Sequence, residues 1–164
     1  MNRIIVLIAV LLISEPLWGN NQMHIIKGYE KWSEVEILTG LIIGEARGEP
    51  IQGKVAVAMT VKTRHDNPGW WGRNWREVIL KPDQFSCWND HNAVVIREAY
   101  NLKNSLWQGC LAIATNVYLG QTPDTIGKPT HYHTVDDHPE WDKNLIFLKQ
   151  IGTQNFYHDP EIDK

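Results

Sequence analysis

The chain has 164 residues and a formal net charge of −3, a length that fits one domain preceded by a short targeting segment. The weakly acidic balance argues against nucleic acid or an anionic membrane surface as the partner. Eight tryptophans are many for this length. Several stand beside glycine or asparagine, where their flat faces suit either sugar binding or a small core.

The N-terminal residues have the pattern of a secretory signal. Arg3 supplies a positive charge, residues 4–13 form an aliphatic stretch, and Gly19 follows a short interruption. A permanent anchor needs about twenty apolar residues, so this stretch is too short for one. The sequence predicts a signal peptide or releasable signal anchor over residues 1–19, a leader over 20–32, and a folded domain over 33–164 in the periplasm or cell envelope.

Export gives a possible meaning to the two cysteines, Cys87 and Cys110. In an oxidising compartment they could form one disulfide. Two buried thiols are the equally simple alternative, and the sequence does not choose between them.

Helical periodicity and end signals dominate the first two thirds of the domain. Ser33 and Glu36 form a capping box before an apolar helix that Gly48 and Pro50 end. Further helices are predicted over residues 51–65, 75–80, 93–102 and 106–119.

The character of the sequence changes after Pro123. Residues 83–92 are too polar and irregular for a core element, whereas residues 130–134, 146–151 and 155–158 have the composition of strands. The predicted fold class is α+β, mainly helical, with a small antiparallel sheet near the C-terminus.

Glu45 lies in the last turn of the first predicted helix. Partial desolvation and the negative end of the helix dipole both disfavour the ionised carboxyl, so we expect a raised pKa. A raised pKa is what a general acid needs to protonate a glycosidic oxygen near neutral pH. On position alone, however, a carboxylate paired with Arg47 or another cation is the simpler interpretation.

Four blocks of the sequence together resemble the SleB-type cell wall hydrolases, which are spore-cortex-lytic enzymes and their bacterial and phage relatives. They are residues 42–58 with the run EARGEP, residues 84–88 (QFSCW), residues 130–141 with THYH, and residues 151–157 with Ile-Gly and Phe-Tyr. The resemblance extends over residues 34–158, nearly the whole predicted domain.

The resemblance implies a lysozyme-like catalytic domain that acts on peptidoglycan glycan strands. Glu45 would be the acid/base of a lytic transglycosylase that cleaves the β-1,4 bond between N-acetylmuramic acid and N-acetylglucosamine. It would protonate the leaving oxygen and then accept the proton of the muramoyl 6-hydroxyl, without a nucleophilic second carboxylate. Glu49 and Asp90 are candidates if a second carboxyl takes part. No cofactor or metal is implied, and we expect a monomer that contacts the membrane only through its N-terminal segment.

The same blocks supply the predicted substrate-binding residues. Polar groups would bind acetamido or hydroxyl groups, aromatic rings would form a wall of the groove, and local loop structure is the alternative. Tyr132 faces opposite to its two neighbours on the predicted strand. The residues are Gln84, Phe85, Ser86, Trp88, His131, Tyr132 and His133.

Three positions depart from the family pattern. Thr63 stands where the family usually has asparagine before the arginine of the second helix. Gln154 stands where it usually has histidine, and residues 124–129 are a loose version of its glycine-rich turn. These departures affect the predicted groove and leave Glu45 in place.

Two other functions compete with the transglycosylase. A zinc amidase that cuts the stem peptide from muramic acid could use His131 and His133, with Asp136, Asp137, His138 or Glu140 as a third ligand. No HExxH-like pair is present to support it. A glycan-binding accessory of lysis is the non-enzymatic alternative, and it gives no reason for the placement of Glu45.

Overall fold

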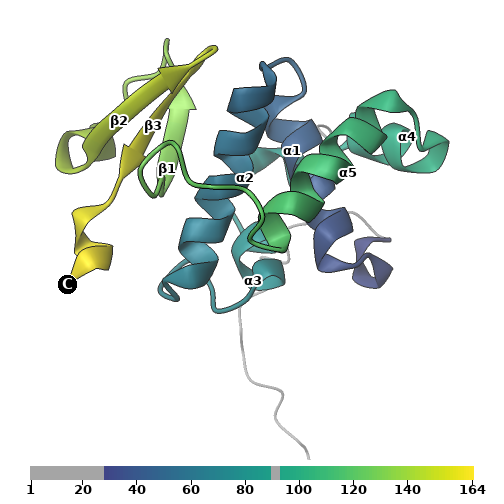
Figure 1. Ribbon diagram of the computed structural model, residues 1–164, viewed down its shortest axis with the longest axis horizontal. Coiled ribbons are helices and arrows are strands. Elements are labelled where there is room, and N and C mark those ends of the chain that lie inside the picture. The colour runs from purple at the N-terminus through teal and green to yellow at the C-terminus, as the bar shows by residue number, and fades with distance from the viewer. Residues whose placement is uncertain (1–27, 90–92) are drawn as a thin grey trace, which may run out of the picture.

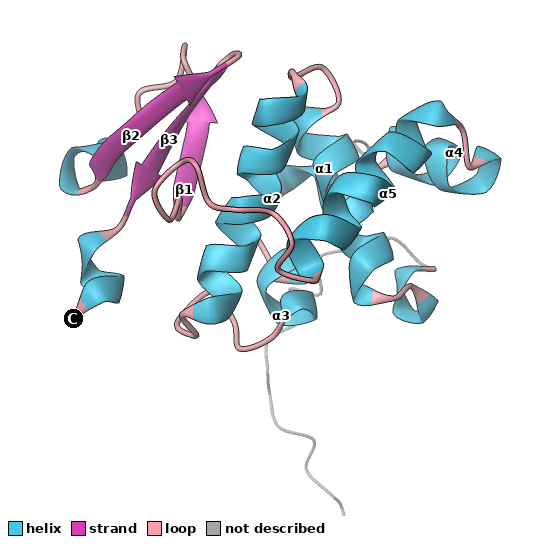
Figure 2. Cartoon of the chain, viewed as in Figure 1, coloured by secondary structure: helices cyan, strands magenta, loops and turns pink. Residues whose placement is uncertain are grey.

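The structure, a computed structural model, describes residues 28–89 and 93–164. The predicted signal segment and most of the leader therefore lie outside the described residues. The helices pack together as one body, and a small sheet lies beside them next to α2 (Figure 1). The secondary structure follows the predicted α+β, mainly helical class (Figure 2). The helices are α1 (Glu34–Ala46), α2 (Ile51–Asp66), α3 (Trp75–Leu80), α4 (Val94–Leu102) and α5 (Ser105–Tyr118).

Helix α1 is the central element of the core. Its capping box forms as predicted: the Ser33 hydroxyl accepts the Glu36 N–H, and the Glu36 carboxylate accepts the Ser33 N–H at 2.9 Å. Apolar side chains cover the helix on most sides, and five of them are fully buried: Ile37, Leu38, Leu41, Ile42 and Ile43. Burial of this many aliphatic groups is the main stabilising term for the domain.

The sheet is antiparallel and has three strands in the order β1-β3-β2. Their bounds are β1 (His131–Thr134), β2 (Ile146–Ile151) and β3 (Gln154–His158). In the register, Tyr132 pairs with Phe156, and both side chains pack towards the helices as part of the core or against it. The sheet thereby places β1 next to the C-terminal end of α1.

Glu49 ties the sheet to the helical body. Its carboxylate accepts the Thr153 N–H at 3.0 Å and the Thr153 hydroxyl at 2.5 Å. Thr153 lies in the turn between β2 and β3, where Gly152 has a φ of +59° that favours glycine. Both oxygens of Glu49 thus hold this turn, and a part of Glu49 in catalysis stays a prediction.

Two expectations about the chain organisation are wrong in detail. The end of the predicted leader belongs to the domain, since Tyr29 and Trp32 are buried in the core. Phe85, Cys87 and Trp88 are also buried, although residues 83–92 were expected outside the core. Among the described residues, no helix combines the length and the apolar character needed to cross a bilayer.

Candidate functional site

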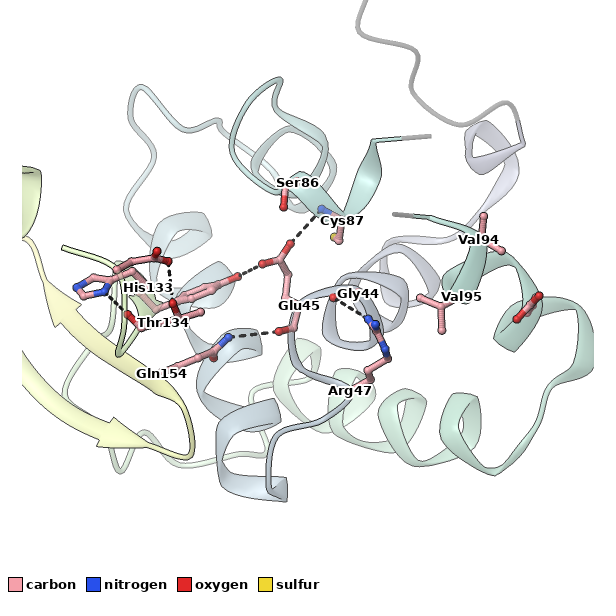
Figure 3. Close-up of a pocket in the computed structure, with 13 residues that line it drawn as sticks. Gly44, Glu45, Arg47, Ser86, Cys87, Val94, Val95, His133, Thr134 and Gln154 are labelled. Atoms are coloured by element: carbon pink, nitrogen blue, oxygen red, sulfur yellow. Dashed lines mark hydrogen bonds between the residues drawn. The ribbon is translucent and has the colours of Figure 1, made fainter. Parts of the chain in front are cut away.

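Glu45 is held by two segments that are distant from it in the sequence. The Tyr132 hydroxyl on β1 donates to Oε2 at 3.1 Å, and the Cys87 backbone N–H donates to Oε1 at 3.2 Å. Figure 3 shows the carboxylate pointing towards Cys87 and Ser86, while the Gln154 amide reaches the Glu45 main-chain oxygen. Each carboxylate oxygen therefore accepts a hydrogen bond, and the side chain has a fixed orientation.

Glycine on α1 makes this arrangement possible. A Cβ atom at Gly44 would lie 2.4 Å from the Cys87 Cβ, far closer than two side chains can approach. The missing side chain lets the short 3₁₀ turn Ser86–Trp88 lie directly on the last turns of α1. This contact brings the Cys87 N–H to the carboxylate of Glu45.

The two groups nearest to Glu45 keep their protons. Burial and the adjacent Glu45 charge raise the pKa of Tyr132 well above its usual range, so its hydroxyl remains a donor. The same two causes raise the pKa of the Cys87 thiol. A thiol that does not ionise is a poor nucleophile. Cys87 and Cys110 are both free and buried, so the structure has the two buried thiols and not the disulfide.

Two cavities adjoin at Glu45, with volumes of about 650 Å³ and 530 Å³. Glu45, Ser86 and Tyr132 line both of them. The larger cavity has polar walls that include Arg47, Glu98, Thr134, Asp137 and Gln154. The smaller one, which we call the aromatic cavity, is lined by Arg64, Trp70, Asp83, Gln84, Phe85, His131 and Trp141 in addition to the three shared residues. The Glu45 side chain is therefore open to two separate spaces.

Exposed tryptophans flank the aromatic cavity. Trp70 is 57% exposed and Trp141 is 40% exposed, and their ring centroids lie 6.5 Å and 5.4 Å from that of His131. Burial and the positive charge of Arg64 lower the pKa of His131 to about 4, so its ring is uncharged at neutral pH. These faces offer apolar surface to a ligand that lies along the cavity.

The structure brings most of the predicted binding residues together. Gln84, Phe85, His131, Ser86 and Tyr132 line the aromatic cavity, the last two also line the polar one, and His133 lines the polar one. Their roles in binding stay predictions.

Trp88 does not line either cavity. It is 3% exposed and packs edge-to-face on Tyr29, with centroids 4.7 Å apart. A Cβ atom at Gly40 would lie 2.9 Å from its ring, so Trp88 fills a notch on α1. It is a core residue and not part of the groove, because that notch buries the ring completely.

Several lining residues had no role in the sequence analysis. Arg64 stands inside a buried helical run, where a charged residue is unusual, and this was the signal available for it. Trp70, Trp141 and Gln154 were noted only as tryptophans or as parts of motifs. Gln154 donates to the main chain of Glu45 at 3.3 Å, so the glutamine at this departure from the family pattern lies at the site. Asp90, the other second-carboxyl candidate, lies outside the described residues.

The two histidines of the amidase alternative do not belong to any metal-ligand cluster of the described residues. His133 Nδ1 lies 2.7 Å from the Thr134 carbonyl and therefore donates, while Nε2 lies 2.8 Å from the Tyr157 hydroxyl. Both nitrogens have protein partners. Within residues 28–89 and 93–164, no three His, Cys, Asp or Glu side chains converge as metal ligands do. The described residues thus do not fit zinc at this strand.

Comparison with known proteins gives one family and one fold. Residues 48–157, about two thirds of the chain, match the family model described as cell wall hydrolase. The structure is similar to the catalytic domain of the germination-specific lytic transglycosylase SleB from Bacillus anthracis, with 23% identity, a TM-score of 0.60, and coverage of 80% of this chain and 98% of that chain. It is also similar to the catalytic domain of SleB from Bacillus cereus, with 23% identity, a TM-score of 0.60, and coverage of 85% of this chain and 100% of that chain.

These matches confirm the resemblance drawn from the EARGEP and QFSCW blocks and the expected fold class. No curated protein matches the chain. Glu45 lies just before the span of the family match, so its role depends on the geometry described above.

Proposed function

The chain belongs to the cell wall hydrolase family, and from that premise we propose that it is a lytic transglycosylase of peptidoglycan with Glu45 as acid and base. The bond cleaved is the β-1,4 bond between N-acetylmuramic acid and N-acetylglucosamine. The observation that carries the proposal is the placement of the Glu45 carboxylate where the polar and aromatic cavities adjoin. The similar fold of two SleB catalytic domains supports the proposal. The one from Bacillus anthracis is described as a lytic transglycosylase.

The chemistry needs one carboxyl. In the first step Glu45 donates its proton to the glycosidic oxygen as the bond from the muramoyl C1 to that oxygen breaks. In the second step the carboxylate accepts the proton of the muramoyl 6-hydroxyl, whose oxygen bonds to C1 and closes a 1,6-anhydro ring. Glu45 is protonated again and no water is consumed. Tyr132 and the Cys87 N–H keep the carboxylate aimed through both steps.

Other carboxylates do not replace Glu45 in this scheme. Both oxygens of Glu49 bind Thr153. Glu98 and Asp137 line the polar cavity, but the proposed reaction leaves them without a chemical step. An exported location, as the N-terminal sequence predicts, would place the enzyme on the same side of the inner membrane as its substrate.

The test is mass spectrometry of the soluble fragments from purified peptidoglycan digested by the chain. We expect fragments that end in 1,6-anhydro-muramic acid, and we expect Glu45→Gln to release none while melting at the temperature of the wild type. Glutamine has nearly the volume of glutamate but donates no acidic proton. Fragments with a reducing muramic acid would show hydrolysis instead, and free stem peptides would show an amidase. Full activity of Glu45→Gln would exclude Glu45 as the acid.

A further inference from the structure

Arg64 on α2 is a buried cation without an acidic partner in the part of the chain that the structure describes. It is 5% exposed. Nε donates to the Thr130 carbonyl at 2.7 Å and Nη1 donates to the Gln84 side-chain oxygen at 3.2 Å. A guanidinium has five N–H groups, so most of them find no acceptor among the described residues. Both acceptors that it has are neutral.

Aromatic rings complete the surroundings of the guanidinium. Its central carbon lies 5.8 Å from the Trp71 ring centroid and 5.5 Å from that of Phe85. Such contacts favour a cation, but they bring no negative charge. Burial lowers the pKa of Arg64 to about 10, which still leaves it charged at neutral pH. A buried charge without a counterion is costly, so the fold maintains this one at the expense of stability.

The charge faces the aromatic cavity, which Arg64 lines together with Glu45. The other acids there do not neutralise it. Glu45 is bound by Tyr132 and Cys87, and Asp83 is exposed. No ion pair within 4.0 Å joins Arg64 to any described carboxylate. A ligand that brings a carboxylate into this cavity would satisfy the free N–H groups.

We propose that Arg64 binds a carboxylate of the glycan strand, namely the lactyl carboxylate of a muramoyl residue that has lost its stem peptide. The inference rests on the proposed function. Sugars of the strand are otherwise uncharged, and the lactyl group is attached directly to the muramoyl ring. It can therefore reach the floor of a cavity that holds the ring, whereas stem-peptide carboxylates lie further from the ring. A preference for peptide-free strands follows, and a reaction that removes stem peptides would supply this substrate.

The experiment is isothermal titration calorimetry on the full chain carrying Glu45→Gln, so that ligands are not cleaved. The first ligand is a tetrasaccharide of alternating N-acetylglucosamine and N-acetylmuramic acid with free lactyl carboxylates. The second is the same tetrasaccharide with both carboxylates converted to methyl amides. We expect the free carboxylate form to bind about 10- to 100-fold more tightly, as charge-assisted hydrogen bonds do. Equal affinities, or no binding of either ligand, would overturn the inference.

A third ligand separates the two possible sources of the carboxylate. It is the tetrasaccharide with stem peptides attached, whose lactyl groups are amides but whose peptides carry carboxylates. We expect it to bind as weakly as the methyl amide. If it binds as tightly as the free form, the carboxylate comes from the peptide and the lactyl assignment is wrong.

A nearly isosteric variant tests Arg64 without removing it. Gln84→Glu places a carboxylate at the atom that already lies 3.2 Å from Nη1, so the protein supplies the counterion itself. We expect this variant to lose the preference for the free form over the methyl amide and to melt no lower than the wild type. Gln121→Glu adds the same charge on the exposed surface outside both cavities and should keep the preference.

A retained preference in Gln84→Glu would overturn the role of Arg64. The proposed function is tested separately by digestion of peptidoglycan with the wild-type chain. If the wild-type chain releases no fragments ending in 1,6-anhydro-muramic acid, the proposed transglycosylase activity is wrong. Equal binding of the ligands would contradict only the carboxylate site.

Discussion

The hydrogen bond from Tyr132 to Glu45 is the contact that joins the sheet to the proposed catalytic carboxyl. Tyr132→Phe removes this donor and keeps the ring packed against Phe156. We expect the rate of peptidoglycan cleavage to fall about fivefold, since one orienting hydrogen bond of about 1 kcal/mol is lost. Release of soluble muropeptides per unit time measures the effect.

The matched control is Tyr118→Phe. That hydroxyl also donates to a carboxylate, Glu34, at 2.9 Å, but Tyr118 lines neither cavity at Glu45. Its loss should leave the rate unchanged. If Tyr132→Phe cleaves as fast as Tyr118→Phe, the tyrosine does not position Glu45.

His131 makes the stability of the fold depend on pH. Its pKa is about 4 in the folded chain because burial and Arg64 disfavour the charged ring, compared with about 6.5 when unfolded. Between these values the unfolded chain binds more protons, so stability is complete above pH 6.5 and falls as the pH drops towards 4. We expect the free energy of unfolding to decrease by about 2–3 kcal/mol over this range from this group. Urea denaturation at several pH values, compared with His131→Gln, isolates the contribution, and parallel curves for the two proteins would contradict it.

Single residues were predictable from the sequence only where a motif marks them. Glu45 could be found because it lies in EARGEP at the end of an apolar helix. Its donors could not, because Tyr132 and Cys87 lie 87 and 42 positions away. Arg64 could not be assigned a role either, since its unpaired charge is visible only once its neighbours are placed.

The substitution Glu49→Gln distinguishes a carboxylate that holds the β2–β3 turn from one that takes part in peptidoglycan cleavage. Glu49→Gln removes one of the two oxygens that bind Thr153 and loosens the β2–β3 turn from the end of α1. We expect the free energy of unfolding to fall by about 1–2 kcal/mol, with the cleavage rate of the folded protein nearly unchanged. Chemical denaturation and a peptidoglycan digestion assay measure the two quantities.

The comparison variant is Glu140→Gln, whose exposed carboxylate pairs with Lys143 and contributes little. Its stability should equal that of the wild type. A loss of activity by orders of magnitude in Glu49→Gln, without loss of folded protein, would instead identify Glu49 as a second catalytic carboxyl.

Some secondary-structure elements could be predicted from their sequences more accurately than others. Helix α3 (Trp75–Leu80) and strand β2 (Ile146–Ile151) have the predicted bounds, because periodicity and flanking turn residues mark them. The turn Ser86–Trp88 was missed as a core element. A short turn has no period of its own, and its burial depends on the notches that Gly40 and Gly44 leave on another helix.

The groove is a property of the whole molecule, because it requires α1, the turn Ser86–Trp88 and β1 to meet. No local pattern predicts that three segments leave two cavities at one carboxylate. The family resemblance predicted the fold. The division of the groove into an aromatic and a polar cavity became visible only when the three segments were placed. A long substrate would meet a different surface in each cavity, since the described lining of the aromatic cavity includes exposed tryptophans and that of the polar cavity does not.

Trp70→Ala and Trp141→Ala remove those faces. If a sugar lies against them, each variant should raise KM for glycan strands about two- to tenfold, the effect of losing an aromatic contact of 0.5–1.5 kcal/mol. The value of kcat should change little, because the proposed scheme gives the rings a part in binding and none in breaking the bond. Initial rates over a range of concentrations of soluble, uncrosslinked strands separate the two constants.

Phe147→Ala is the matched control for these variants. Phe147 is 55% exposed, nearly as much as Trp70, but it lies on β2 against Tyr157 and lines neither cavity at Glu45. A general loss of surface aromatic area would affect all three variants alike, whereas sugar binding in the aromatic cavity affects only the two tryptophans. An unchanged KM in both tryptophan variants would mean that the strand does not contact these rings, and substrate binding on that side of Glu45 would then depend on Gln84, Arg64 and His131.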